Sequence, residues 1–384
     1  MNQRIMYEKA RPAYLVGKTV NFFSGRPGNP RTGEGSFARL KNGSILSLYS
    51  EFYGENDWSD YGISRISGTV SHDEGETWGE PFPVFEIPDG YSQLMCASLL
   101  RLADGDLAAL FLARIDSDRD LTQVFFARCI NGTDVWHTVP VMSGEDITDR
   151  YHVLENDRLV QLKSGRLIIP TSFMPNDRAE DDPYLSEQYL TVHYSDNGGR
   201  TWTNAHADLK IPFIRTKYGL QEPGIIEMPD GRLRMWARTG LGCQYESWSG
   251  DCGLTWSVPT PMEFFKSPLS PMMMKKFGDM VAAVYNPEPF HIVNEKPEKY
   301  LKEKVGLFYD RTPLAISVSD DGGRSFDRTY LLEDDPYSIY SYPAIFDGGD
   351  YILVSYYHSN RTDNFFNSKK TVKISKEELI QPTY

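Results

Sequence analysis

Six polar segments stand directly before apolar strand patterns, where a chain that enters a protein core is normally apolar. They are Arg31-Thr-Gly-Glu34-Gly-Ser, residues 93–98, Glu155-Asn-Asp157-Arg158, Gln221-Glu222-Pro, Ser267-Pro-Leu-Ser270-Pro and Tyr340-Ser-Tyr342-Pro. Carboxylates exchange protons and arginines hold anions, so these residue types are those of a ligand-binding or catalytic site. They form one site only if the strands that follow bring them together.

Each polar segment leads into a hairpin of two apolar strands joined by a short turn that ends in glycine. The turn glycines are Gly43, Gly105, Gly165, Gly231, Gly278 and Gly348, at intervals of 62, 60, 66, 47 and 70 residues. A four-stranded antiparallel blade with its loops has about this length. The chain therefore contains six predicted hairpins, one for each blade.

A second repeat is an eight-residue motif, here called the octet. It occurs four times, at residues 71–78, 195–202, 249–256 and 319–326, with a degenerate version at 131–136. Ser71, Asp73 and Gly75 suit a tight turn, because Ser and Asp side chains accept hydrogen bonds from backbone N–H groups and Gly adopts φ > 0. Thr77 and Trp78 are expected to start a strand with an aromatic anchor. We interpret the octet as a structural motif and not as a catalytic one.

Together the repeats predict an all-β fold, a six-bladed β-propeller that occupies residues 1–384 as a single domain. Residues 1–20 are expected to supply an outer strand that closes the ring with the last blade, and the last residues a short helix or strap. In a propeller the innermost strand of each blade lines the axis, so the residues before it gather at one mouth. The six polar segments are therefore expected to meet there.

Composition excludes several classes of partner. The net charge is −13 and no basic run is present, so neither a nucleic acid nor an anionic membrane is an expected partner. The four cysteines lie far apart and are expected to be reduced and mostly buried. The N-terminal residues show no apolar signal-peptide core, so a cytoplasmic protein is the default expectation. The oligomeric state is left open.

With its six hairpins and its octets of the form S-x-D-x-G-x-T-W, known as Asp boxes, the chain resembles the sialidase (exo-α-neuraminidase) superfamily over nearly its whole length. The resemblance implies a tyrosine nucleophile activated by a glutamate, an aspartate as general acid and base, and three arginines around the substrate carboxylate. A neutral phenol suits an anionic sugar, because a carboxylate nucleophile would be repelled by the carboxylate of the sugar itself.

The resemblance assigns these roles to particular residues. Glu222 resembles the partner of the tyrosine, and Arg238, which closes the same hairpin, resembles one carboxylate-binding arginine. Arg311 stands before the strand that leads into the last octet, as the third arginine of the family does. Tyr342 lies 31 residues further on and is the expected nucleophile, with Tyr340 as the alternate.

The acid and base is expected in the loop that follows the first inner hairpin. Asp57 and Asp60 both lie in this loop, and the register of the following strand favours Asp60 as the catalytic residue and leaves Asp57 as a substrate contact. Gln221, next to Glu222, is a further expected substrate contact.

One departure from the family pattern concerns the first arginine. Where sialidases begin the first inner strand with Arg-Ile-Pro, this chain has Gly33-Glu34-Gly35-Ser36-Phe37. Three other arginines are available to supply the charge, namely Arg31, Arg26 and Arg158. The departure leaves open a different acidic sugar or a neutral sugar as the substrate, and Glu34 is an expected substrate contact through a hydroxyl group.

We therefore hypothesise an exo-glycoside hydrolase that removes a terminal, acidic sugar from an oligosaccharide or glycoside with retained configuration, without a metal ion or cofactor. One alternative is a glycosidase or lyase of the same fold that acts on another uronic or deoxy sugar, which the Glu34 departure motivates. Another is a propeller that binds carbohydrate or protein without catalysis.

Overall fold

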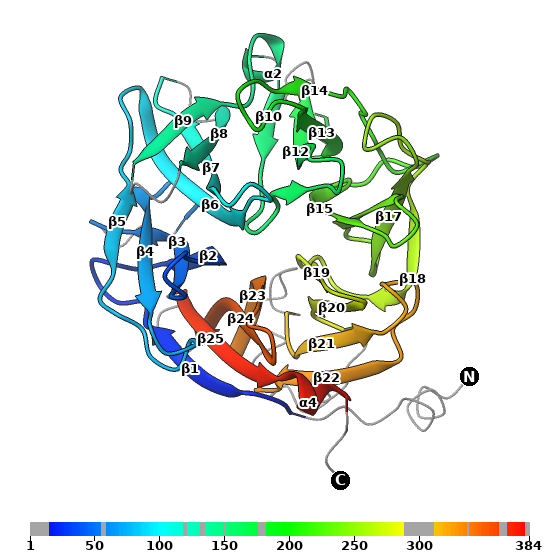
Figure 1. The fold of residues 1–384 in the computed structure, drawn as a ribbon. Helices are drawn as coiled ribbons and strands as arrows, with labels where there is room; N and C mark the ends of the chain where they lie inside the picture. Colours follow the sequence, from blue (N-terminus) through cyan, green and yellow to red (C-terminus); the bar gives the residue numbers. More distant parts are fainter. Residues whose placement is uncertain are drawn as a thin grey trace, which may run out of the picture.

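The computed structural model describes residues 15–54, 59–117, 121–130, 135–148, 150–175, 182–287, 311–335, 338–360 and 367–380. Within these ranges the strands form six antiparallel sheets arranged as a ring around a central axis (Figure 1). The predicted six-bladed propeller is confirmed.

The blades follow the chain in order. Blade 1 contains β2 (Thr32–Arg39), β3 (Ile45–Phe52), β4 (Ser64–Ser71) and β5 (Phe82–Phe85); blade 2 contains β6 (Tyr91–Arg101), β7 (Leu107–Ile115), β8 (Thr122–Cys129) and β9 (Trp136–Pro140). Blade 3 contains β10 (Arg150–Val153), β11 (Val160–Gln161), β12 (Leu167–Pro175), β13 (Tyr189–Ser195) and β14 (Thr203–Asn204). Blade 4 contains β15 (Gln221–Glu227), β16 (Leu233–Arg238), β17 (Cys243–Ser249) and β18 (Thr260–Lys266). Blade 5 contains β19 (Met273–Phe277), β20 (Met280–Tyr285), β21 (Leu314–Ser319) and β22 (Arg328–Glu333).

Blade 6 is built from both ends of the described chain. Its strands β23 (Ser338–Asp347), β24 (Tyr351–Asn360) and β25 (Ser368–Ser375) are completed by β1 (Lys18–Phe23), which pairs antiparallel with β25. An N-terminal strand therefore closes the last blade, as predicted, although it spans Lys18–Phe23 and extends beyond the predicted residues 1–20. The two helices described are α2 (Glu145–Thr148) and α4 (Lys376–Ile380), and neither has the length and apolar composition to cross a membrane.

The burial of each strand explains how many apolar residues it contains. Middle strands such as β7 (LAALFLARI) and β20 (MVAAVY) are buried along almost their whole length, because neighbouring blades cover both of their faces. The outermost strand β18 (TPMEFFK) buries only Met262 and Phe265 and exposes the residues between them. The apolar content therefore falls from the middle of a blade to its rim.

The octets form the predicted turns between the third and fourth strands. In the first octet, Ser71 Oγ accepts the N–H of Gly75 at 2.9 Å, Asp73 Oδ1 accepts the N–H of Thr77 at 2.9 Å, and Trp78 Nε1 donates to the Gly75 carbonyl at 3.2 Å. Gly75 has φ +82°. The expectation that Thr-Trp starts the strand is wrong, because β5 begins only at Phe82.

The seam between blade 6 and blade 1 contains a buried lysine. The ammonium of Lys369 lies 5.2 to 5.8 Å from the ring centroids of Phe23, Phe37, Tyr49 and Trp78, and the side chain is 1% exposed. No described carboxylate forms an ion pair with it. Burial lowers the pKa of Lys369 to about 7.

Replacing Lys369 with Met is expected to raise the free energy of unfolding by about 1–3 kcal/mol at pH 6, because the buried charge is removed while the aliphatic length is kept. The pKa of a lysine in the unfolded chain is about 10.4, so the native protein gains stability as pH rises from about 7 toward that value. The Lys369→Met variant should lose that component of the pH dependence. Denaturant unfolding between pH 6 and 9.5 measures both effects.

The control is Lys18→Met, which changes an exposed lysine in the neighbouring strand β1. Its stability should stay within about 0.5 kcal/mol of the native protein. A Lys369→Met variant that unfolds more easily than the native protein at pH 6 would contradict the proposed cost of the buried ammonium.

Candidate functional site

Four inner strands contain a β-bulge that turns one side chain out of the regular alternation. The extra residues are Glu34 in β2, Cys96 in β6, Glu222 in β15 and Tyr342 in β23, and their φ angles are +51°, +61°, +50° and +57°. Positive φ costs a non-glycine residue roughly 1–3 kcal/mol, and such strain is typical of functional sites. The bulges re-aim polar side chains that the alternation of a regular strand would place elsewhere.

The inner strand of blade 3 differs from these four strands, because it is interrupted between β10 and β11. Residues 155–158, which we call the crosspiece, leave the strand and are fully buried. The Asp157 carboxylate accepts hydrogen bonds from Ser36 Oγ at 2.7 Å, from Lys275 Nζ at 2.9 Å and from the backbone N–H of Ile345 at 3.2 Å. The backbone N–H of Asp157 donates to the Ala97 carbonyl at 3.2 Å. Asp157 of blade 3 is thus hydrogen-bonded to residues of blades 1, 2, 5 and 6.

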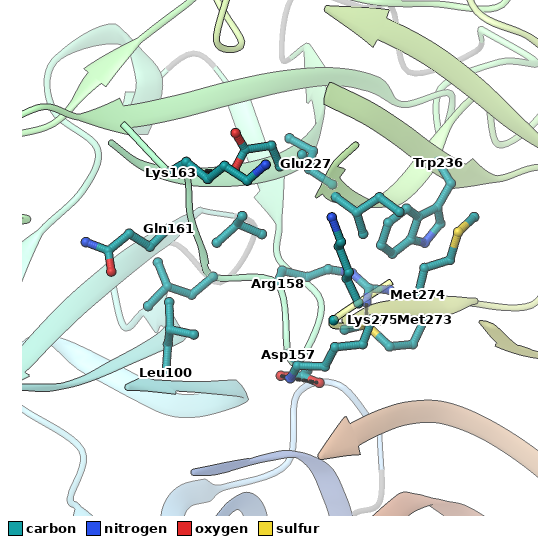
Figure 2. Close-up of a pocket in the computed structure, with 16 residues that line it drawn as sticks. Leu100, Asp157, Arg158, Gln161, Lys163, Glu227, Trp236, Met273, Met274 and Lys275 are labelled. Atoms are coloured by element: carbon teal, nitrogen blue, oxygen red, sulfur yellow. Dashed lines mark hydrogen bonds and ion pairs between the residues drawn. The ribbon is translucent and has the colours of Figure 1, made fainter. Parts of the chain in front are cut away.

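Arg158 completes the crosspiece and faces blades 4 and 5. Its guanidinium donates to the Met272 carbonyl at 2.8 Å and lies 5.5 Å from the Trp236 ring centroid. Figure 2 shows it in a cavity of about 370 Å³ that Asp157 and Lys275 also line. Neither Glu222 nor Tyr342 lines this cavity, so the structure gives Arg158 contacts that differ from those expected of a substrate-binding arginine.

Tyr342 and Glu222, the residues expected as nucleophile and partner, contact each other across the axis. The Tyr342 hydroxyl donates to Glu222 Oε1 at 3.4 Å, and Arg238 Nη2 forms an ion pair with the same oxygen at 2.9 Å. Gln221 Oε1 accepts from Arg238 Nε at 3.2 Å and orients the guanidinium. Arg311 lies over the Tyr342 ring, with 5.5 Å from Cζ to the ring centroid.

The electrostatics keep the phenol protonated. Burial raises the pKa of Tyr342 above its ordinary value, Glu222 raises it further, and the two arginines, Arg238 and Arg311, lower it by less. The proton of Tyr342 must therefore leave to a base during any reaction in which the phenol oxygen attacks. Glu222 Oε2 and Arg238 Nη1 are buried and make no hydrogen bond to the described residues, so each has an unsatisfied hydrogen-bonding position.

Arg31, one of the three arginines named for the missing charge, lies beside Glu34 and Asp60. It lies just before β2, its Nε donates to the Tyr357 hydroxyl at 2.7 Å, its Nη1 to Asp60 Oδ1 at 2.6 Å, and its Nη2 pairs with Glu34. Partial desolvation by the protein around the mouth would raise the pKa of Asp60, but the charges of Arg31 and Arg114 hold it below its ordinary value. Asp60 remains 64% exposed at the mouth, so solvent reaches the carboxylate.

The other expected residues are placed differently. Tyr340 is 1% exposed and packs against Tyr356 and His358, on the other side of β23 from Glu222. Arg26 is exposed in the turn before β2. Asp57 lies outside the described residues.

Three residues at the site were not assigned a role from the sequence. Glu155 is 2% exposed, and burial followed by the charges of Glu222 and Glu34 raises its pKa well above the ordinary value despite Arg158. Tyr357 holds Arg31, and Arg114 faces Asp60 from blade 2. Arg114 follows Ala113 at the end of its second strand, just as Arg238 follows Ala237, and this repetition was the available signal.

A metal site is not evident among the side chains that the structure describes. No group of three or more His, Cys, Asp or Glu residues there is arranged to hold a metal ion. The chemistry of the site can be derived from its carboxylates, arginines and phenols.

Comparison with known proteins identifies a family for this chain. Residues 150–354, more than half of the chain, match the family described as a BNR repeat-like domain. The chain is 28% identical over 234 residues to the anhydrosialidase of Macrobdella decora, and the match covers 57% of this chain but only 27% of that protein.

Two solved structures share the fold at low sequence identity. The leech intramolecular trans-sialidase complexed with 2,7-anhydro-Neu5Ac has a TM-score of 0.69 and 14% identity, covering 99% of this chain and 73% of that one. The intramolecular trans-sialidase from Ruminococcus gnavus in complex with oseltamivir carboxylate has a TM-score of 0.68 and 15% identity, covering 94% and 99%. At these identities the likeness shows the fold.

Replacing Asp157 with Ala is expected to lower the free energy of unfolding by about 3–5 kcal/mol, because the ammonium of Lys275 loses its ion pair and two further buried donors lose their acceptor. The matched control is Asp196→Ala, whose carboxylate is 57% exposed and pairs with Arg166 at the surface. The control should cost at most about 1 kcal/mol. Denaturant unfolding of both variants is the measurement, and equal losses would refute the special role of the crosspiece.

Proposed function

The chain belongs to the BNR repeat-like family of sialidase-type propellers, and from this we propose that it is an exo-glycosidase that releases a terminal acidic sugar with retained configuration. The observation that carries the proposal is the Tyr342 hydroxyl at 3.4 Å from Glu222 Oε1, with Arg238 and Arg311 beside the pair. A buried phenol, a carboxylate base and two arginines around one point form an arrangement suited to a glycoside with an anionic group.

In the first step the Tyr342 oxygen attacks the anomeric carbon and its proton passes to Glu222. Asp60, in its protonated form, gives its proton to the glycosidic oxygen, so the leaving group departs as an alcohol. The bond between the sugar and the phenol oxygen replaces the glycosidic bond. The 3.4 Å separation in the ligand-free site is long for proton transfer and is expected to shorten when substrate binds.

In the second step water attacks the anomeric carbon of the glycosyl-enzyme. Asp60, now ionised, takes a proton from the water, and the Tyr342 oxygen recovers its proton from Glu222. Two displacements at the same carbon give retained configuration. Both catalytic carboxyl groups return to their starting protonation states.

The arginines explain the proposed preference for an acidic sugar. Arg238 and Arg311 lie beside Tyr342, and Arg31 contributes a third guanidinium from the first blade. A planar carboxylate can accept parallel hydrogen bonds from such groups. In the free site Glu34 and Asp60 balance the charge of Arg31, so a substrate carboxylate competes with Asp60 for this guanidinium.

A second candidate function differs only in the group that opens the glycosyl-enzyme. The similar proteins named anhydrosialidase and intramolecular trans-sialidase motivate it. If a hydroxyl of the bound sugar replaces water in the second step, the product is an internal ether and not the free sugar. Mass analysis of the released sugar separates the two outcomes by one water molecule, and an unsaturated product would instead indicate a lyase.

Replacing Tyr342 with Phe is expected to lower kcat on an aryl α-N-acetylneuraminide by about 10³-fold or more, because the nucleophilic oxygen is removed while the ring is kept. The release of the fluorophore between pH 5 and 7 is the measurement. Tyr340→Phe is the control and should retain kcat within a few-fold, since Tyr340 packs on the other side of β23. An active Tyr342→Phe variant would remove the tyrosine from the mechanism.

Replacing Arg31 with Gln is expected to move the alkaline limb of kcat/KM to higher pH, as well as lowering its maximum. Asp60 acts as an acid only when protonated, and Arg31 is the main group that holds its pKa down. Without Arg31 the pKa of Asp60 rises, so the protonated form persists at higher pH. Full pH profiles of the two proteins test this.

The control for the pH profile is Arg39→Gln, which breaks a surface ion pair with Glu74. Its profile should coincide with that of the native protein. If the alkaline limb of the Arg31→Gln variant stays where it is in the native protein, Asp60 is not the acid.

A further inference from the structure

The cavity of about 370 Å³ beside the crosspiece is separate from the candidate catalytic site (Figure 2). Glu222 and Glu227 stand near opposite ends of β15, and of these two residues only Glu227 lines the cavity. Five residues of strand span roughly 15 Å. The cavity therefore lies along the later parts of the inner strands, whereas Tyr342 and Glu222 stand near their beginnings.

One wall of the cavity is fixed before any ligand arrives. Arg158 Nη2 and Trp236 Nε1 both donate to the Met272 carbonyl, each at 2.8 Å, and both side chains are 1% exposed. Arg158 Nε is buried and makes no hydrogen bond to the described residues. A guanidinium with an unsatisfied donor is costly to bury, and an anion close to this wall would offset part of that cost.

The lining of the cavity is positively charged, although the chain as a whole has a net charge of −13. It contains four cationic side chains and two carboxylates, which belong to Arg158, Lys163, Lys275, Lys276, Asp157 and Glu227. The four positive and two negative charges leave an excess of +2. This excess favours an anionic ligand.

The two carboxylates already have partners in the free protein. Asp157 accepts from Lys275 Nζ at 2.9 Å, and Glu227 Oε2 accepts the backbone N–H of Lys163 at 2.9 Å. By contrast, the ammonium groups of Lys163 and Lys276 form no ion pair with a residue that the structure describes. Lys276 is partly exposed, so its ammonium can meet a ligand that enters from solvent.

The remaining walls are mostly apolar. Leu100, Ile225, Ile226 and Met274 line the cavity and come from blades 2, 4 and 5. Apolar walls with a few charged groups are typical of sites for small organic molecules, and the volume is at the lower end of the range of such sites. The ligand that fits is thus small, anionic at one end and apolar at the other.

We propose that this cavity binds a phosphate monoester of a small apolar organic group. Lys276 contacts the phosphate, and the charges of Arg158 and Lys275 add to the attraction. The organic group lies against Ile226 and Met274. A phosphate monoester has a charge of about −1.5 to −2 at pH 7, which matches the excess charge of the lining. The inference does not depend on the proposed glycosidase function, since no residue of the catalytic arrangement takes part.

Isothermal titration calorimetry of the full chain with phenyl phosphate, inorganic phosphate and phenol tests the site. Phenyl phosphate is expected to bind once per chain and at least about fivefold more tightly than inorganic phosphate, because its ring buries apolar surface. Phenol lacks the charge and should show no saturable binding. Lys276→Gln should weaken the binding of phenyl phosphate at least about tenfold, because the charged donor is lost.

The matched control is Lys266→Gln, which changes an exposed lysine at the end of the outermost strand β18, away from the cavity. This variant should bind phenyl phosphate within about twofold of the native chain. Lys276→Arg keeps the positive charge and should recover most of the affinity that Lys276→Gln loses. That recovery separates a lost contact from a disturbed fold.

The arginines of the catalytic mouth are the competing site for a phosphate, so Arg238→Gln is measured as well and should bind phenyl phosphate like the native chain. Loss of binding in Arg238→Gln with no change in Lys276→Gln would assign the ligand to the mouth and overturn the proposal. The absence of saturable binding to the native chain would also overturn it, as would equal affinities for phenyl phosphate and inorganic phosphate. Glycoside cleavage is not measured in this experiment, so the failure of either proposal leaves the other intact.

Discussion

The Asp157 carboxylate is the interaction on which the rest of the structure depends. In a ring of six sheets no strand crosses the axis, so the inner strands need another means to fix their relative positions. Asp157 provides it by accepting hydrogen bonds from blades 1, 5 and 6 while its backbone binds blade 2. A buried carboxylate with all its acceptor positions directed at named donors allows little movement of any one of them. Asp157 holds blade 6, which carries Tyr342, and Arg158 next to it lies over Trp236 of blade 4, which carries Glu222.

The site also requires that its side chains point toward the axis, and the bulges provide this direction. A regular strand alternates its side chains between two faces that both belong to blade packing, so it has no position that points along the axis. One extra residue at Glu34, Cys96, Glu222 and Tyr342 creates such a position in four inner strands. The bulges also place carboxylates close to one another, and the arginines that balance them are the same groups that a substrate anion would contact. The backbone strain and the clustering of charged side chains at the site are thus both consequences of the β-bulges.

Sequence reasoning predicted the fold well and the site in part, for a physical reason. Turn glycines and octets are local signals, and they correctly give six hairpins and the closure of the ring. The contact between Glu222 and Tyr342 was also anticipated, because the resemblance to the sialidase superfamily assigned the two residues as partners. Arg31 was one of three arginines named for the missing charge, and the sequence did not rank them. The contacts of Arg31 with Glu34 and Asp60 depend on the bulged backbone of β2, which the sequence pattern does not indicate. Arg158 was expected among the substrate contacts, because nothing in a linear run of polar residues indicates that its side chain turns toward blades 4 and 5.

The pairing of β1 with β25 has a consequence for how the protein is made. Lys18 pairs with Lys373, so the first strand described has no partner in its own sheet until the ribosome has delivered almost the whole chain. Blades 1 to 5 each contain only sequence-local strands and can form in order during synthesis. Blade 6, which carries Tyr342, can be completed only by a contact of very high sequence separation, and such contacts form slowly. The tyrosine therefore enters its environment last, and a truncated or stalled chain would contain Glu222 and Arg238 but no assembled site.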